Sequence, residues 1–169
     1  MALDTLLLLF FPALMAYAAI SDMLTMTIPN RVSLALIAGF IAMAILTGMP
    51  LATFGLHMAA GALVLVITFT LFAFGFIGGG DAKLAAATGI WCGFGFLAQY
   101  LVFASIMGGV LTLLIIYVRT LLLPEFATKI SWVARLHHHK SGIPYGIALA
   151  GAGLLVYPHT PIWTLVAAS

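Results

Sequence analysis

Gly78-Gly79-Gly80-Asp81-Ala82-Lys83 is a short polar stretch that lies between two long apolar runs of the chain. A carboxylate at the edge of a membrane span is costly, and such a residue by default indicates function. Glycine permits backbone conformations that other residues rarely adopt and lets a second backbone come close. Together these features are typical of a site that cleaves peptides. A glycine-rich turn with Asp81 and Lys83 as solvated loop charges would give the same stretch. The choice between the two interpretations depends on whether a second carboxylate can reach the same place.

The composition indicates an integral membrane protein. Of the 169 residues, 64% are hydrophobic and 6% are charged, whereas a soluble domain carries about 25% charged residues. The length fits a single transmembrane domain over residues 1–169. A net charge of +2 is too small to indicate nucleic-acid binding. Cys92 is the only cysteine, which excludes an internal disulfide and a CxxC zinc site, and we expect neither a metal nor a cofactor.

The apolar runs predict an all-α membrane protein with a bundle of six transmembrane helices, because a span needs roughly 20 apolar residues. The first run has no basic segment before it and no clear cleavage site, so we expect a retained helix rather than a signal peptide. Pro29 is predicted to start the second helix, since proline is favoured in the first helical turn. Two points stay open: whether the fourth helix extends to residue 99, and whether residues 162–168 cross the membrane. The predicted helices cover residues 2–20, 30–47, 53–77, 82–93, 96–123 and 143 onward.

Residues 125–142 form the only long polar loop. Apolar residues recur at helical spacing between positions 126 and 136, which predicts a short amphipathic helix on the membrane surface. The run His137-His138-His139 cannot direct all three rings at one metal from a regular helix, so we interpret it as a solvated or headgroup-facing loop. His57, near the start of the third predicted helix, is interpreted as a membrane-interface histidine without a functional role.

The basic residues predict the orientation of the chain in the membrane. With six helices, every lysine and arginine falls in or beside the first, third or fifth loop, and the other loops and both termini have none. By the positive-inside rule that side is cytoplasmic, so both termini are expected outside. The six residues are Arg31, Lys83, Arg119, Lys129, Arg135 and Lys140.

The same topology leaves one candidate pair of carboxylates. Asp22 ends the first predicted helix on the cytoplasmic side and Asp81 precedes the fourth on that side, whereas Asp4 lies on the opposite face and Glu125 in the long loop. Two carboxylates that share a site do not easily both ionise, so the pair holds one proton. The ionised partner can take a proton from water as general base, while the protonated partner donates a hydrogen bond to the scissile carbonyl. The sequence does not determine which aspartate plays which role.

Three motifs, in order along the chain, resemble the type IV prepilin peptidase family of GxGD membrane aspartic peptidases. Asp22 followed by Ile28-Pro29-Asn30 is similar to the first aspartate of that family and its IPN segment. Gly78-Gly79-Gly80-Asp81 and Lys83 match the GxGD-x-K pattern, and Ile143-Pro144-Tyr145-Gly146 resembles the segment that opens the last helix. The resemblance spans essentially the whole chain and implies Asp22 and Asp81 as catalytic residues. The implied supporting or substrate-binding residues are Pro29, Asn30, Gly78, Gly79, Gly80, Lys83, Pro144, Tyr145 and Gly146.

One departure from the family narrows the resemblance. The larger bifunctional members carry a cysteine-rich segment for N-methylation between the first two helices, whereas that connection is short here and has no cysteine. The chain is therefore more similar to the short CpaA/TadV-type peptidases of tight-adherence (Flp) pilus systems. The similarity implies a multi-pass protein of the bacterial inner membrane that removes the leader of prepilins or pseudopilins at the cytoplasmic face, cutting after a glycine. The implied partners are that substrate, the lipid bilayer and pilus-assembly components.

Two alternatives stay open. An archaeal preflagellin peptidase or a presenilin-like intramembrane peptidase would keep the chemistry and change the substrate. A small transporter or assembly subunit would instead use Asp22 and Asp81 to carry protons or cations. Transporters often show internal repeats and acidic residues near the middle of the membrane, whereas these two acids lie at predicted helix ends and the sequence shows no repeat.

Overall fold

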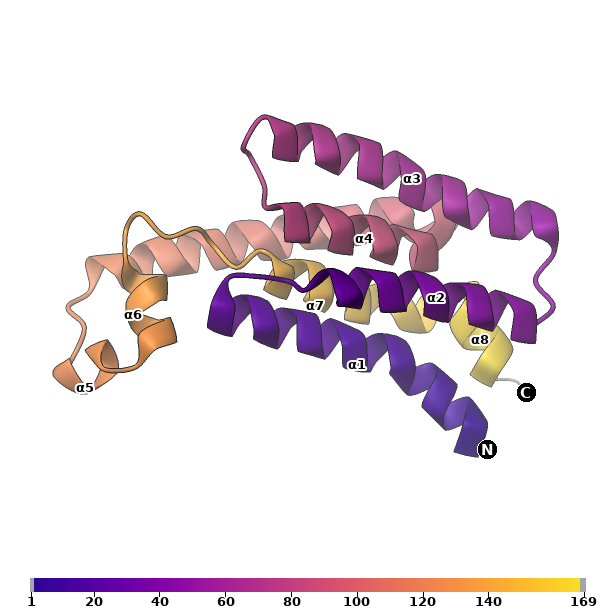
Figure 1. The fold of residues 1–169 in the computed structure, drawn as a ribbon, viewed down its shortest axis with the longest axis horizontal. Helices are drawn as coiled ribbons and strands as arrows, with labels where there is room; N and C mark the ends of the chain where they lie inside the picture. The colour runs from indigo at the N-terminus through magenta and orange to yellow at the C-terminus, as the bar shows by residue number, and fades with distance from the viewer. Residues whose placement is uncertain (1, 168–169) are drawn as a thin grey trace.

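The computed structural model describes residues 2–167, with side chains from residue 7 to residue 166. All regular structure in this part of the chain is helical (Figure 1), which confirms the predicted all-α class. Three helical stretches are apolar and long enough to cross a membrane: Leu7–Thr25, Leu51–Ala73 and Gly79–Thr120. The elements are α1 (Ala2–Thr25), α2 (Asn30–Leu46), α3 (Leu51–Ala73), α4 (Gly79–Thr120), α5 (Glu125–Thr128), α6 (Ser131–His137), α7 (Gly146–Val156), η1 (Tyr157–His159) and α8 (Pro161–Ala167).

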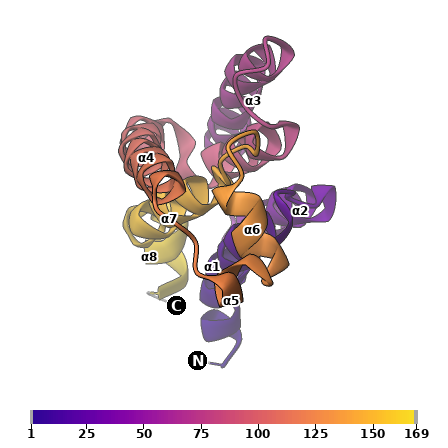
Figure 2. The ribbon, with the colours of Figure 1, turned by 90° about the vertical axis from the view of Figure 1, so that its left-hand side faces the viewer.

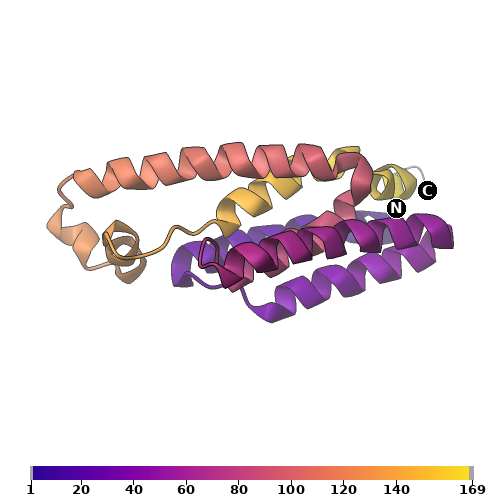
Figure 3. The same cartoon turned by 90° about the horizontal axis from the view of Figure 1, so that it is seen from above.

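The helices of the bundle run side by side (Figure 2) and reverse direction from one to the next (Figures 1 and 3). The loops at residues 26–29 and 74–78 lie at the end of the bundle that carries α5 and α6, and both ends of the chain lie at the other (Figure 1). α4 is central, because it packs against α2, α3 and α7. The number of membrane crossings and the side on which the termini lie stay predictions.

Gly93 breaks α4 into two helices that run in opposite directions. Its φ of 58° and ψ of 176° are not helical, and the ribbon of α4 turns back on itself at this point (Figure 3). The break falls where the sequence predicted the fourth helix to end and the fifth to follow. His57 from α3 fills the space above Gly93, because an added Cβ there would lie 2.7 Å from its ring.

His57 was predicted to be a membrane-interface residue. The structure shows instead that it is buried and caps the break. Its side chain is only 5% exposed, and Nδ1 lies 2.7 Å from the carbonyl oxygen of Ile90. A carbonyl oxygen only accepts, so Nδ1 carries the hydrogen and donates it. The last carbonyls of a helix have no partner within it, and His57 supplies one for the first half of α4.

Two predicted helix ends are corrected by the structure. α1 continues past Ile20 to Thr25, so Asp22 lies within its last turns rather than at its end. α3 ends at Ala73 rather than Ile77, because Gly75 takes a left-handed φ of 77°. The N–H of Gly75 donates to the carbonyl of Phe72, and the N–H of Phe76 to that of Leu71. This pairing terminates helices in a Schellman motif, and glycine has no steric penalty at its left-handed position.

The region after the long second half of α4 also differs in detail. A single amphipathic helix over residues 126–136 is wrong, because the chain forms α5 and α6, and Ile130 between them is extended with φ −88° and ψ 110°. His137 ends α6, with Nε2 2.9 Å from the carbonyl oxygen of Leu121. Residues 162–167 do not continue α7, since they belong to the separate short helix α8. Residue 168 lies outside the described part of the chain.

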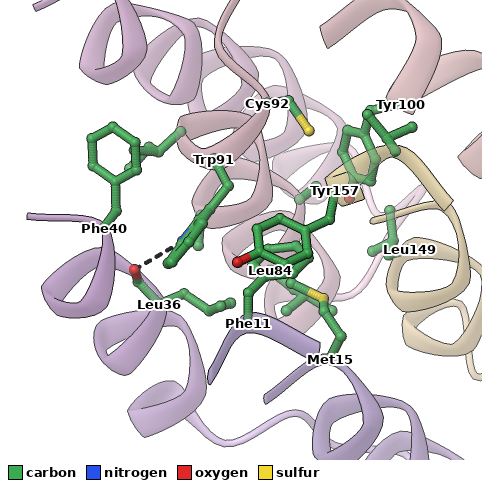
Figure 4. Close-up of a cluster of buried hydrophobic side chains, with 14 of the residues drawn as sticks. Phe11, Met15, Leu36, Phe40, Leu84, Trp91, Cys92, Tyr100, Leu149 and Tyr157 are labelled. Carbon is green, nitrogen blue, oxygen red and sulfur yellow. Dashed lines mark hydrogen bonds between the residues drawn. The ribbon is translucent and has the colours of Figure 1, made fainter. Parts of the chain in front are cut away.

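Aromatic side chains fill the centre of the bundle (Figure 4). Trp91 is fully buried, packs against Phe11 and Tyr157 at ring-centroid distances of 5.0 and 5.8 Å, and donates from Nε1 to the carbonyl oxygen of Leu36 at 3.0 Å. These rings come from α1, α4 and η1. They connect the first half of α4 to α1, α2 and η1.

Candidate active site

Asp22 is a buried carboxylate near the end of α1. Its side chain is 5% exposed, and Oδ2 accepts a hydrogen bond of 2.8 Å from the backbone N–H of Gly146. Gly146 is the first residue of α7, and the first N–H groups of a helix have no partner within it. The carboxylate therefore satisfies one of them and lies at the positive end of the helix dipole.

Gly146 has no side chain for a steric reason. A Cβ at this position would lie 2.8 Å from Oδ2 of Asp22 and 2.7 Å from Cδ1 of Ile28. The N-terminus of α7 can approach the carboxylate this closely only because residue 146 is glycine.

Asp81 lies in the first turn of α4 and its carboxylate folds back over the preceding glycines. Oδ2 would lie 2.9 Å from a Cβ on Gly78, so Gly78 leaves room for it. Oδ1 is buried and has no hydrogen-bond partner among the residues that the structure describes. An unpaired buried oxygen costs free energy.

Both carboxylates open into the same space. A cavity of about 850 Å³ has Asp22 and Asp81 in its wall, together with residues 75–78 and 141–143. A second cavity of about 280 Å³ also has both aspartates in its wall, with residues 26–28 and 78–80. The structure thus brings together two acids from α1 and α4 that lie far apart in the sequence.

Ile28 packs between the start of α4 and the start of α7. It is buried, and a Cβ on Gly80 would lie 3.2 Å from its Cβ and 3.4 Å from its backbone nitrogen. The other side of Ile28 faces Gly146 through Cδ1. The loop after α1 therefore packs between the start of α4 and the start of α7. The sequence motif contained Ile28, but its role was not predicted from its apolar side chain.

Tyr145 reaches the larger cavity from the residue before α7. Its hydroxyl lies 3.4 Å from the carbonyl oxygen of Ala104, and its ring lies directly over Gly108, where an added Cβ would overlap it. Burial, followed by the nearby charge of Asp81, raises the pKa of the Tyr145 phenol. Gly108 was not predicted as part of the site; the pair Gly108-Gly109 inside an apolar helix is the signal that could have indicated it.

Lys83, Asn30 and Pro29 lie beside the site but not in it. The ammonium of Lys83 donates to Oδ1 of Asn30 at 2.9 Å, and none of the three residues lines either cavity that contains the aspartates. Pro29 precedes α2 in an extended conformation, with φ −62° and ψ 137°. These residues connect the start of α2 to the start of α4, so their part in the motif is structural in this arrangement.

Of the remaining predicted residues, some line a cavity that contains the aspartates and others do not. Gly79 and Gly80 line the smaller cavity, and Gly79 lies against Phe72, whose ring is 3.2 Å from an added Cβ. Pro144 lies outside both aspartate cavities and lines an apolar one between α1, α4, α6 and α7. Within the residues whose surroundings are described, no group of three acidic, histidine or cysteine side chains is arranged to hold a metal.

Arg119 is a cavity residue that the sequence indicated only as a topological charge. It lines the larger cavity, and its guanidinium donates to the carbonyl oxygens of Leu136, Ser141 and Gly142 at 2.8, 3.0 and 2.9 Å. It thereby fixes the segment that leads to Tyr145. Its position inside a predicted apolar helix is the signal that could have assigned it to the site.

The helical fold and the apolar helices are those of a membrane protein, and a buried and a half-buried aspartate at one cavity are the side-chain set of an aspartic-type peptidase. Residues 9–113 match the model of the type IV leader peptidase family. This match covers more than half of the chain and includes both aspartates, and the chain belongs to that family of proteases. Comparison with curated proteins and with solved structures finds no match.

Proposed function

We propose that the chain is a membrane aspartic endopeptidase that removes the leader of type IV prepilins or pseudopilins of the Flp/Tad type at the cytoplasmic membrane face. The observation that carries this proposal is the meeting of Asp22 and Asp81 in one cavity. Family membership supports the peptidase class. The short connection between α1 and α2, without a cysteine, supports a peptidase that lacks the methylation segment.

In the proposed mechanism, Asp22 is the general base. The N–H of Gly146 donates to its carboxylate, and a hydrogen bond to the charged form favours that form. The backbone N–H of Gly78 interacts with the Asp81 carboxylate, but its Oδ1 has no donor to stabilise a negative charge there, so Asp81 is the partner that holds the shared proton. Asp22 takes a proton from water as the oxygen attacks the scissile carbonyl, and Asp81 donates to the carbonyl oxygen. The proton on Asp22 then passes to the leaving amine as the C–N bond breaks, and Asp81 takes back the proton of the diol hydroxyl, which restores the starting state of the pair.

In this proposal the cavity takes the substrate peptide in extended conformation. Its wall includes the glycine-containing backbone at residues 75–78 and the segment 141–143, and glycine lets a peptide backbone approach closely. The segment that Arg119 holds borders the same space, so it would limit how the substrate enters. By the positive-inside rule the basic residues assign this end of the bundle to the cytoplasm.

Asparagine substitutions test the proposal. Asp22→Asn and Asp81→Asn each keep the side-chain volume but can neither accept the proton of water nor hold a shared one. Each should abolish processing of a prepilin co-expressed at matched enzyme levels. The double variant should be little worse than either single variant, because the two groups act as one unit. Asp4→Asn and Glu125→Gln are the controls and should remain active. Near-normal processing by either single variant would exclude the mechanism and favour transport of protons or cations.

A further inference from the structure

An apolar cavity of about 460 Å³, separate from the two aspartate cavities, lies between α2, α3 and α4 and has neither aspartate in its wall. On each of the three helices its lining residues recur at i, i+3, i+4 and i+7, beginning at Asn30, Met58 and Lys83. α2 and α3 both pack on α4, so α4 forms the floor and the other two helices form walls. Seven residues of helix extend over about 10 Å, which gives the groove the length of part of an acyl chain.

The polar residues of this groove gather at one end. Asn30, Ser33 and Lys83 lie in the first turns of α2 and α4, at the same end of the bundle as Asp81. The residues one and two turns deeper, such as Ile37 and Ile90, are apolar. In a membrane, the ends of helices lie at the level of the headgroups, where lysine places its ammonium.

Each of these three polar side chains leaves a donor free, and the Lys83 ammonium adds a positive charge. Lysine can only donate, so the oxygen of Asn30 is its acceptor at 2.9 Å and the amide NH₂ of Asn30 is left over. The Lys83 ammonium has two further N–H groups, and no carboxylate of the described residues pairs with it. Ser33 is only 6% exposed, lines the groove, and its hydroxyl has no hydrogen-bond partner in the described part of the chain. An acceptor-only, negatively charged group complements this set.

We propose that the groove between α2, α3 and α4 binds one anionic phospholipid, with its phosphate at Lys83, Asn30 and Ser33 and an acyl chain along the apolar floor. The small side chains of Ala86 on the floor and Ala62 on the α3 wall leave room for a chain to lie along the groove. A second protein helix would bury the ammonium without supplying the negative charge that the donors require. The phospholipid provides both the charge and the apolar chain in one molecule.

Native mass spectrometry of the purified protein, titrated with phosphatidylglycerol or phosphatidylcholine, tests this site. The wild-type protein should retain one phosphatidylglycerol more tightly than phosphatidylcholine. Lys83→Met should weaken phosphatidylglycerol binding about fivefold, the effect of one basic residue at a membrane surface, while Lys129→Met should not. Lys129 is an exposed lysine outside the groove.

A steric variant keeps the proposal testable if Lys83→Met does not fold. Ala62→Phe fills the groove from the exposed side of α3 and should weaken binding about tenfold or more, as expected for an overpacked site. Ala59→Phe, also exposed on α3 but outside the groove, should bind as the wild type does. Equal phosphatidylglycerol binding by Ala62→Phe and Ala59→Phe would overturn the site. Retention of a free fatty acid or inorganic phosphate in place of the phospholipid would overturn the assigned ligand. The readout needs no peptide substrate, so it is independent of the proposed peptidase activity.

Discussion

Replacing Gly146 by alanine would place a methyl group 2.8 Å from Oδ2 of Asp22 and 2.7 Å from Cδ1 of Ile28. Ordinary contact begins at 3.4 Å, so the carboxylate would have to retreat from 2.8 to 3.4 Å, about 0.6 Å. This movement stretches the 2.8 Å hydrogen bond from the N–H of residue 146. Gly146 has no left-handed φ, so the effect comes from this overlap and not from backbone strain.

We expect Gly146→Ala to lower the rate of processing more than the stability of the fold. A displacement of 1 Å in a catalytic geometry can cost about 10²-fold in rate, so 0.6 Å should lower processing by about tenfold to a hundredfold. Weakening a hydrogen bond to a charged group costs about 1.5–3 kcal/mol. Alanine is favoured over glycine in helices by about 1 kcal/mol, which offsets part of that destabilisation.

The assay is the single-turnover rate of leader removal from a prepilin in proteoliposomes, with thermal unfolding in detergent measured alongside. Gly109→Ala is the matched control, because a Cβ there has nothing within 4 Å. It should leave the processing rate unchanged and raise stability by about 1 kcal/mol, the helix preference of alanine. If Gly146→Ala processed substrate at the wild-type rate, the contact between Gly146 and Asp22 would not position the catalytic carboxylate, and the assignment of Asp22 as base would lose its support.

Three further outcomes are expected. Gly108→Ala should lower stability by about 1–3 kcal/mol, the usual cost of overpacking, and slow processing, because its methyl group overlaps Tyr145; an unfolding midpoint equal to that of Gly109→Ala would contradict this. Reporter fusions should give an outside signal after Ser169 and a cytoplasmic signal within residues 125–142, and a cytoplasmic signal after Ser169 would refute the topology. Chelators should leave processing intact, and mass spectrometry should find no methyl group on the new N-terminus; a methylated product in a host without another methyltransferase would show that the short connection does not exclude that activity.

Local sequence was sufficient to predict the helical class and the residues that carry charge. Apolar runs of membrane length predict helices because the backbone must satisfy its own hydrogen bonds in lipid. The fourth helix was predicted to end near Gly93 or to reach residue 99, and the structure breaks it at Gly93, where a left-handed φ suits glycine. The two acids could be paired because the alternation of helices puts residues 22 and 81 at one end of the bundle. Each of these inferences needs only neighbouring residues and a count of helices.

Contacts between distant residues could not be predicted in this way. The N–H of Gly146 reaches Asp22 across 124 positions, and His57 caps a helix that ends 33 residues later. Lys83, two residues after Asp81, points to Asn30 instead of the acids, although the motif gave no reason to separate them. Such contacts depend on the packing of whole helices. Only the tertiary structure therefore decided that Gly146 and Gly108 leave room for Asp22 and Tyr145. It also decided which polar residues line the apolar groove between α2, α3 and α4.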